Sequence, residues 1–200
     1  MATHAEQFLH YLRRLASAPA RDQTTDAALV ARFVHGKDEE AFTALVSRHA
    51  PMVFGVCRRV LRDTHNAEDA AQATFLVLAR KASTLRRPDA LAAWLHRTAH
   101  HLALLSRRSD ARRQDRETRV LRAAPPRSPS DPLDELSVRE LLAILDQEVQ
   151  QLPEVYRLPL ILCCLEGRTA EEAARQLGWT PGSVRGRLMR GRARLHQRLH

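Results

Sequence analysis

The segment that decides the fold reads Gly167-Arg-Thr-Ala-Glu-Glu-Ala-Ala-Arg-Gln-Leu-Gly-Trp-Thr-Pro-Gly-Ser-Val-Arg185. Thr169 and Glu172 have the spacing of a capping box, which starts a helix by satisfying its free N–H groups. Gly178 can end that helix because glycine readily adopts the left-handed conformation. Thr180 can cap a second helix, with proline at its first position. Two short capped helices around a glycine turn predict a helix-turn-helix.

The second of these helices is strongly basic. Its inward stripe is expected to hold Val184, Leu188, Leu195 and Leu199. Residues 173–200 contain seven arginines and no acid, which is +7 of the chain's net +9. A solvated helix normally interleaves acids with its bases, so this pattern favours a polyanion such as the major groove of DNA. The alternative is a merely basic surface helix.

The composition indicates an all-α protein and is compatible with binding to nucleic acid. Straight-chain helix formers dominate, and the aromatic share of 4% argues against a β-sandwich. Nearly all of the basic residues are arginine, since the only lysines are Lys37 and Lys81. Arginine suits phosphates and guanine edges. GC-rich coding, which favours arginine over lysine, explains the composition equally well.

A proline-rich spacer divides the chain. Residues 123–132 hold four prolines in ten positions, which cannot continue a helix. We therefore predict two small helical domains joined by a Pro-rich linker, the C-terminal one a helix-turn-helix. The predicted parts are an N-terminal arm (1–22), a first module (23–115), a linker (116–132) and a second module (133–200).

Local signals place the helices within each module. In the first module, Asp26 is expected to cap a helix ending at Gly36, Asp38 to cap the next, Pro51 to start a third and Asn66 to open a fourth. A break at 83–88 precedes a long helix from about residue 89. The second module is expected to hold helices at 133–151, about 153–165, about 169–177 and from 180.

Cysteine usage and hydropathy predict a cytoplasmic protein without membrane insertion. Cys57, Cys163 and Cys164 show no paired spacing, and the last two are expected to be small core residues. The apolar runs are too short to span a bilayer. Arg13 and Arg14 interrupt the apolar stretch that a secretory signal would need.

Three segments together resemble a known family. Asn66–Leu78 is similar to an Asp-x-x-Gln-x-x-Phe helix, Ala93–Ala99 to a Trp-Leu segment, and Gly182–Arg192 to a recognition helix. In this order they resemble regions 2 and 4 of the extracytoplasmic-function (ECF) sigma factors of the sigma-70 family. The basic, histidine-containing composition is similar to that of planctomycete members.

The resemblance implies that Asp69, Gln72 and Phe75 dock on core RNA polymerase. Asp69 and Gln72 are three residues apart and so share a helix face. Asp69 in a first turn is also favoured by the helix dipole, and both roles are compatible.

The resemblance also implies two DNA-binding sets. The set for an opened −10-type element is Arg86, Arg87, Arg97, His100, His101, Arg107 and Arg108. The set for a −35-type element is Thr180, Ser183, Arg185, Arg187, Arg190 and Arg192. The sequence departs from the family pattern at His101, where Asn is frequent, at Leu105, where Asp is frequent, and at Gly186, where Ser is frequent.

The expected function is promoter-specific transcription initiation with core RNA polymerase and promoter DNA as partners. An anti-sigma factor is a further expected partner; no cofactor, metal, small-molecule substrate or enzymatic activity is expected. One alternative is a helix-turn-helix regulator that acts without polymerase, which leaves the Asp69 helix without a role. Another is a metalloenzyme built on His96, His100 and His101, which lacks a defined third ligand and the glutamate of a metalloprotease motif.

Overall fold

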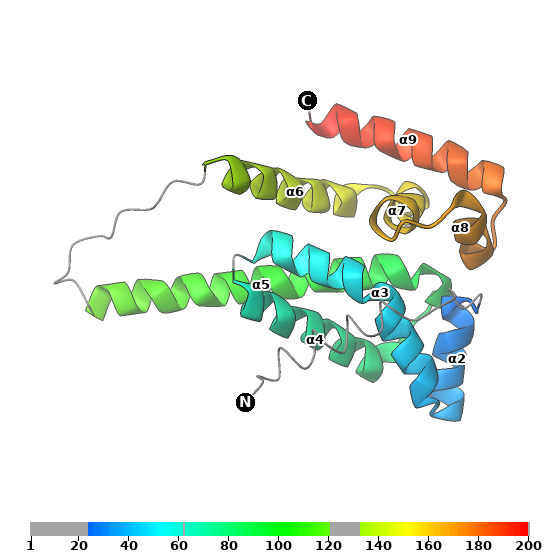
Figure 1. Cartoon of the computed structure of the whole chain (residues 1–200), viewed down its shortest axis with the longest axis horizontal. Coiled ribbons are helices and arrows are strands. Elements are labelled where there is room, and N and C mark those ends of the chain that lie inside the picture. The colour runs from blue at the N-terminus through cyan, green and yellow to red at the C-terminus, as the bar shows by residue number, and fades with distance from the viewer. Residues whose placement is uncertain (1–23, 62, 121–132, 200) are drawn as a thin grey trace.

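The computed structural model describes residues 24–61, 63–120 and 133–199, and the side chains of residues 114–139 lie outside that description. All regular structure in the described residues is helical, which confirms the predicted all-α class (Figure 1). The predicted arm and most of the predicted linker fall outside the described residues.

Four helices build the first module. They are α2 (Asp26–Gly36), α3 (Glu39–Val60), α4 (Thr64–Lys81) and α5 (Leu91–Val120). Short turns η1 (Ala82–Thr84) and η2 (Pro88–Ala90) separate α4 from α5, at the predicted break. The core of this bundle buries large side chains completely, among them Leu29, Leu45, Val53, Leu78 and Leu95. Burial of such apolar surface is the main force holding the module together.

The helix starts differ from prediction in the first module. The cap of α2 is Thr25, whose Oγ1 accepts the amide of Ala28 at 3.3 Å, so Asp26 is wrong as the cap and is the first helical residue. Asp38 caps α3 as predicted, accepting the amide of Ala41 at 3.0 Å. Asp63 caps α4, so the helix begins ahead of the predicted Asn66.

Pro51 does not start a helix, because α3 continues through it. A proline inside a helix costs about 3 kcal/mol or more. Its neighbours Ala50, Met52 and Val53 are all buried in the core, and the gain from burying this stripe offsets that cost. The local proline signal was therefore overridden by packing.

The second module contains α6 (Leu133–Gln151), α7 (Glu154–Leu160), the π-helical turn η3 (Ile161–Leu165), α8 (Ala170–Leu177) and α9 (Pro181–Leu199). The four predicted helices are present, with the expected 153–165 helix divided between α7 and η3. Pro159 lies inside α7, just before the change in winding. A missing proline N–H is a frequent cause of such local irregularity.

The two modules pack against each other. Figure 1 shows α6 running along α3, with α7 and α8 above the start of α5. Ala90, Ala92 and Ala93, at the start of the α5 segment, are buried within the hydrophobic core of the second module. The predicted boundary at 115 falls inside α5, which continues to Val120. No helix among the described residues is long and apolar enough to cross a membrane.

Candidate nucleic-acid interface

The helix-turn-helix forms as its local sequence predicts. The amide of Thr169 donates to Glu172 Oε2 at 2.8 Å, and the amide of Glu172 donates to Thr169 Oγ1 at 3.2 Å, which completes the capping box. Gly178 ends α8 at φ +65°, a conformation that side chains with a Cβ resist. Thr180 Oγ1 then accepts the amide of Ser183 at 3.2 Å and starts α9.

The inward face of α9 is only partly the predicted one. Val184 and Leu195 are buried and Leu188 is half-buried in the module core. Leu199 is 48% exposed, so its predicted core position is wrong: the end of α9 extends beyond the helices that cover its start. Gly191 is buried instead, with the backbone oxygen of Tyr156 where a Cβ would come within 3.2 Å. That close approach fixes how α9 lies on α7.

The arginines of α9 point away from the core. Arg185, Arg190 and Arg192 are exposed, and the half-buried Arg187 stacks on Trp179, with its guanidinium carbon 3.9 Å from the ring centroid. Arg192 Nη2 donates to Cys164 Sγ at 3.3 Å. Cys164 is exposed and Cys163 half-buried, so the prediction that both are core residues is wrong for Cys164.

Neighbouring helices supply some of the acids that residues 173–200 lack. Glu171 on α8 pairs with Arg185, and Glu148 on α6 pairs with Arg198 at 2.5 Å. The lack of acids within residues 173–200 therefore does not leave every arginine charge unpaired, because carboxylates from α8 and α6 pair with two of them. Arg187 and Arg190 still have no carboxylate partner among the described side chains.

The predicted −10 set lines the start of α5 and the turn before it. Arg97, His101 and Arg108 are exposed and follow one another at helical spacing, so they share a face. Arg86 and Arg107 are also exposed. His100 is half-buried, and burial holds its pKa below the ordinary value.

Arg87 differs from the rest of this set because it already has acidic partners. Its Nη2 lies 2.7 Å from Asp89 Oδ2, and its Nη1 pairs with Glu154 at the start of α7. The second module thus contacts one residue of the predicted −10 set in the first.

The predicted polymerase-docking set lies along α4. Asp69 is exposed and Gln72 half-buried, whereas Phe75 is 6% exposed and packs in the module core. Phe75 therefore packs beneath the helix face on which Asp69 and Gln72 reach solvent. Glu68, the neighbour of Asp69, is buried with a carboxylate oxygen that lacks a hydrogen-bond partner among the described residues, and burial raises its pKa.

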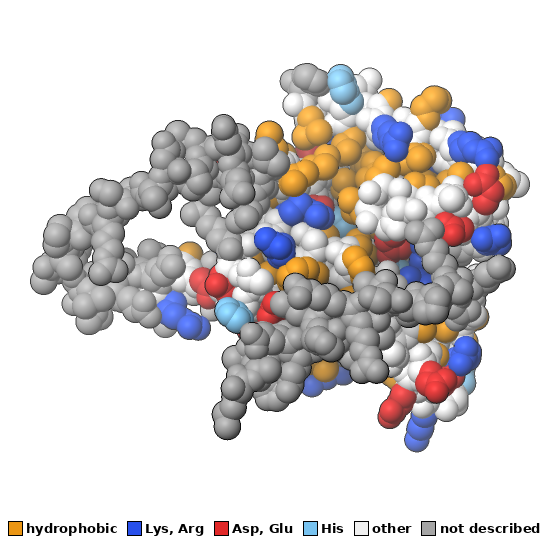
Figure 2. All heavy atoms as spheres, in the orientation of Figure 1, with side chains coloured by type: hydrophobic (Ala, Val, Ile, Leu, Met, Phe, Trp, Pro, Cys, Tyr) orange, Lys and Arg blue, Asp and Glu red, His pale blue; other side chains and the backbone are white. Residues whose placement is uncertain are grey.

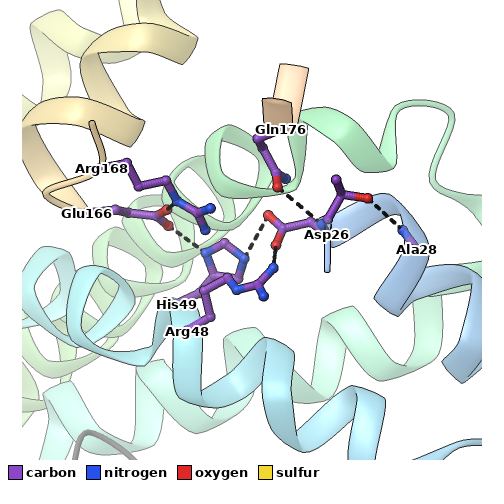
Figure 3. Close-up of polar contacts among 8 residues, drawn as sticks. Asp26, Ala28, Arg48, His49, Glu166, Arg168 and Gln176 are labelled. Carbon is purple, nitrogen blue, oxygen red and sulfur yellow. Dashed lines mark hydrogen bonds and ion pairs between the residues drawn. The ribbon is translucent and has the colours of Figure 1, made fainter. Parts of the chain in front are cut away.

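Two buried polar clusters between the modules were missed by sequence reasoning. The first, here named the latch cluster, consists of Asp26, Arg48, His49, Glu166 and Arg168 (Figure 3). No local pattern indicates it, since His49 and Glu166 are 117 residues apart. The second, the Asp146 cluster, consists of Arg59, His96, Asp146 and Gln150.

His96 therefore has a structural role in place of the metal-binding role considered from sequence. It is completely buried, its Nε2 lies 3.1 Å from Asp146 Oδ1, and its Nδ1 contacts the side-chain Nε2 of Gln150. Among the described residues, no group of three potential ligands is arranged to hold a metal.

Known proteins match both modules. A family model described as "Sigma-70 region 2" matches residues 45–113, and one described as "Sigma-70, region 4" matches residues 142–195. The chain is 32% identical over 156 residues to the ECF RNA polymerase sigma factor SigE of Mycolicibacterium smegmatis, covering 78% of this chain and 60% of that relative. It is 31% identical over 189 residues to the RNA polymerase sigma-H factor of Pseudomonas aeruginosa, covering 88% of this chain and 95% of that relative.

One solved structure extends over nearly the same residues. CnrH in complex with the cytosolic domain of CnrY has 25% sequence identity, covers 89% of this chain and 97% of that chain, and superposes with a TM-score of 0.39. The two family models match this chain in the order region 2, then region 4. The chain belongs to the sigma-70 family, within its ECF group.

Proposed function

We propose that this protein is a sigma factor, which binds core RNA polymerase and directs it to promoters for transcription initiation. The observation that carries the proposal is the pairing, in one chain, of sigma-70 region 2 with a region 4 whose α9 presents an exposed arginine face. In this role the protein binds polymerase and promoter DNA and catalyses no reaction of its own. It works in the cytoplasm, because polymerase is there. A predicted anti-sigma partner stays a prediction.

In this proposal α9 enters the major groove of a −35-type element. Arg190 and Arg192 are exposed and Arg187 is held flat on Trp179, so these guanidinium groups can meet base edges and phosphates. Thr180 and Ser183 lie at the start of α9, where the positive end of the helix dipole favours phosphate oxygens. Phosphate contacts set the register, and base contacts supply the selectivity.

The α5 face binds the −10-type element as an opened strand. Arg97, His101 and Arg108 form a basic track along one helix face, next to the half-buried ring of Trp94. Basic groups that follow the backbone, combined with aromatic stacking, are the usual means of binding single strands. Asp69 and Gln72 on α4 contact core polymerase, supported by Phe75.

Footprinting of the factor–polymerase complex on one promoter tests this assignment. Hydroxyl-radical cleavage should show protection by the second module upstream, and permanganate should detect unpaired thymines beside α5. Arg190→Ala should remove only the upstream protection, and Arg97→Ala with His101→Ala only the unpaired thymines. Loss of both signals together in either variant would contradict the division of roles.

A further inference from the structure

We propose that Cys163 and Cys164 are a thiol pair whose reversible oxidation to a disulfide weakens the binding of α9 to duplex DNA. The oxidant is a peroxide. The link to DNA is Arg192, which contacts Cys164 and belongs to the set assigned to the −35-type element. The inference rests on the proposed function for its DNA partner, and it adds a modification site that the binding role itself does not need.

The three cysteines of the chain have different surroundings. Cys57 is completely buried in the first module, and burial raises its pKa to about 12, so its thiol is shielded from oxidants. Cys164 is exposed, and Cys163 beside it is half-buried against the core of the second module. Oxidation-sensitive thiols combine solvent access with a second cysteine nearby that resolves the first product. Cys164 and Cys163 meet both conditions.

A guanidinium group of the recognition helix lies at the exposed sulfur. Arg192 Nη2 donates to Cys164 Sγ at 3.3 Å, and Arg192 itself is exposed. Figure 2 shows basic side chains (blue) over α9 at the upper edge of the molecule. The thiolate that attacks a peroxide carries a negative charge, and a guanidinium group stabilises such a charge. Arg192 is therefore placed both to assist oxidation of Cys164 and to report it to the DNA-binding face.

The backbone around the pair has to change when the disulfide forms. Both cysteines lie in η3, a π-helical turn in which the amide of Glu166 donates to the backbone oxygen of Ile161 at 3.0 Å. Neighbouring Cα atoms across a trans peptide are about 3.8 Å apart, below the roughly 4.4–6.8 Å that a relaxed disulfide joins. Bridging the pair therefore strains the bond and alters the winding of η3. A strained disulfide is easily reduced, which suits a reversible modification.

The oxidation balances with a peroxide as its one co-reactant. The Cys164 thiolate attacks a peroxide oxygen and the O–O bond breaks, so that a sulfenic acid and hydroxide form; the sulfur is oxidised and the peroxide is reduced. The Cys163 sulfur, whose pKa is raised by burial, reacts second: it attacks the Cys164 sulfur, the S–S bond forms and hydroxide leaves. Each hydroxide combines with one of the two thiol protons. Two thiols and one hydrogen peroxide thus give one disulfide and two water molecules.

The change in η3 reaches α9 at Arg192 and at the residue before it. Gly191 packs against the backbone of Tyr156 on α7, with only 3.2 Å between its Cβ position and the Tyr156 oxygen, and α7 runs directly into η3. Rewinding η3 therefore removes the sulfur that orients the Arg192 guanidinium and disturbs the surface on which this part of α9 lies. A guanidinium that is no longer oriented must be ordered again when it binds a phosphate, which costs affinity.

The test uses the full-length protein in reduced form, after hydrogen peroxide, and after peroxide followed by dithiothreitol. Peptide mass mapping after alkylation locates any disulfide, circular dichroism checks the helical content, and fluorescence anisotropy measures binding to a fluorescein-labelled duplex of random sequence. Cys164→Ser is the matched variant, because it removes the reacting sulfur at an exposed position and keeps an acceptor for Arg192. Arg192→Ala removes the proposed link to DNA.

We expect peroxide to bridge Cys163 and Cys164 in the wild type and to leave Cys57 as a free thiol. The bridged protein should bind the duplex about tenfold more weakly, the effect of losing one charge-assisted contact, and dithiothreitol should restore the binding. The salt dependence of binding should fall by about one phosphate contact. Cys164→Ser should bind like the reduced wild type with or without peroxide. Arg192→Ala should bind more weakly from the start and change little on oxidation.

Free thiols at both positions after peroxide overturn the proposal, and so does a bridged wild type that binds the duplex as tightly as the reduced form. A loss of binding that persists in Cys164→Ser, or that dithiothreitol does not reverse, also overturns it. Such a loss comes from another group, for example the exposed Met189 of α9, whose sulfoxide is not a disulfide.

The two proposals fail in different ways. Should the reduced protein support no transcription with core polymerase, the proposed function is wrong. The disulfide and its effect on duplex binding are measured without polymerase, so they still decide whether the thiol pair acts as proposed.

Discussion

Arg187 lies over the indole of Trp179, with its guanidinium carbon 3.9 Å from the ring centroid. The tryptophan comes directly after the helix-ending Gly178, so the turn of the helix-turn-helix itself orients an arginine of the recognition helix. A stacked arginine loses less freedom when it binds, and a planar guanidinium suits bidentate contact with guanine.

Replacing Trp179 should therefore reduce promoter selectivity more than general DNA affinity. Trp179→Leu should weaken specific promoter binding by about 1 kcal/mol, the scale of an exposed cation–π contact. Trp179→Phe should retain part of the effect. Fluorescence anisotropy with promoter and scrambled duplexes provides the measurement, and an equal loss on both duplexes would rule out the orienting role.

Arg190 provides the direct test of base reading. Arg190→Ala should weaken binding to the promoter by about 1–3 kcal/mol if its guanidinium meets a base edge. Arg194, which stacks on Tyr156 with 4.7 Å between its guanidinium carbon and the ring centroid, is the matched control on the same helix. Arg194→Ala should lower affinity for all sequences alike. Identical selectivity in the two variants would count against the recognition-helix assignment.

Asp69, the exposed acid of α4, and the nearby Gln72 should affect the affinity for core polymerase and leave the stability of the fold unchanged. Asp69→Ala combined with Gln72→Ala should weaken binding to core polymerase by about 2 kcal/mol, because a contact made at a protein interface is truncated. Thermal unfolding should change little, since neither side chain is buried. Glu40→Ala, on the exposed start of α3, is a control. Wild-type polymerase affinity in the double variant would refute the docking assignment.

Gly191 should be intolerant of even one added methyl group. Gly191→Ala places a Cβ 3.2 Å from the backbone oxygen of Tyr156, so α9 must shift away from α7. We expect a loss of about 1–3 kcal/mol in unfolding free energy. Gly182→Ala, with open space around it, should instead be neutral or stabilising by about 0.5 kcal/mol. Urea unfolding of both variants makes the comparison, and equal stabilities would contradict the close packing.

The contacts of His49 lead us to expect that the free energy of unfolding falls as the pH becomes alkaline. Burial alone would lower the pKa of His49, but Asp26 and Glu166 outweigh it and raise the pKa to about 10. Arg48 and Arg168 pair with the same two carboxylates, at 2.6 and 3.0 Å. A raised folded pKa means that the stabilisation is complete below the unfolded value of about 6.5 and is lost as pH rises towards 10.

The comparison with His49→Gln isolates this contribution. The wild type should be more stable by about 3 kcal/mol near pH 6, and the difference should shrink steadily up to pH 10. The two proteins must be compared at each pH, because the wild-type curve alone contains a second effect. Burial raises the pKa of the Cys57 thiol to about 12, so ionisation of this thiol in the unfolded chain also lowers stability at alkaline pH. A difference that stays constant over this range would contradict a protonated His49.

What the sequence predicted well was governed by neighbours along the chain. The capping box at Thr169, the turn at Gly178 and the cap at Thr180 depend on residues within four positions, and all three are present. What it predicted poorly depended on packing. Pro51 lies within α3 because the core holds that helix together, and Leu199 is 48% exposed at the end of α9.

The contacts between modules were beyond local reasoning. Asp26 and Gln176 are 150 residues apart, and no local pattern indicates that they meet. The acids that pair with Arg185 and Arg198 also come from outside the segment whose charge was counted. Family resemblance supplied the predicted functional faces, and only the folded structure shows how the two modules contact each other.

Transcription in vitro with purified core polymerase and a randomised promoter library tests the central claim most directly. With this protein added, RNA should start downstream of selected sequences that share two conserved elements, and Asp69→Ala with Gln72→Ala should reduce the yield sharply. RNA synthesis no greater than that of core polymerase alone, at any concentration of the protein, would contradict the account.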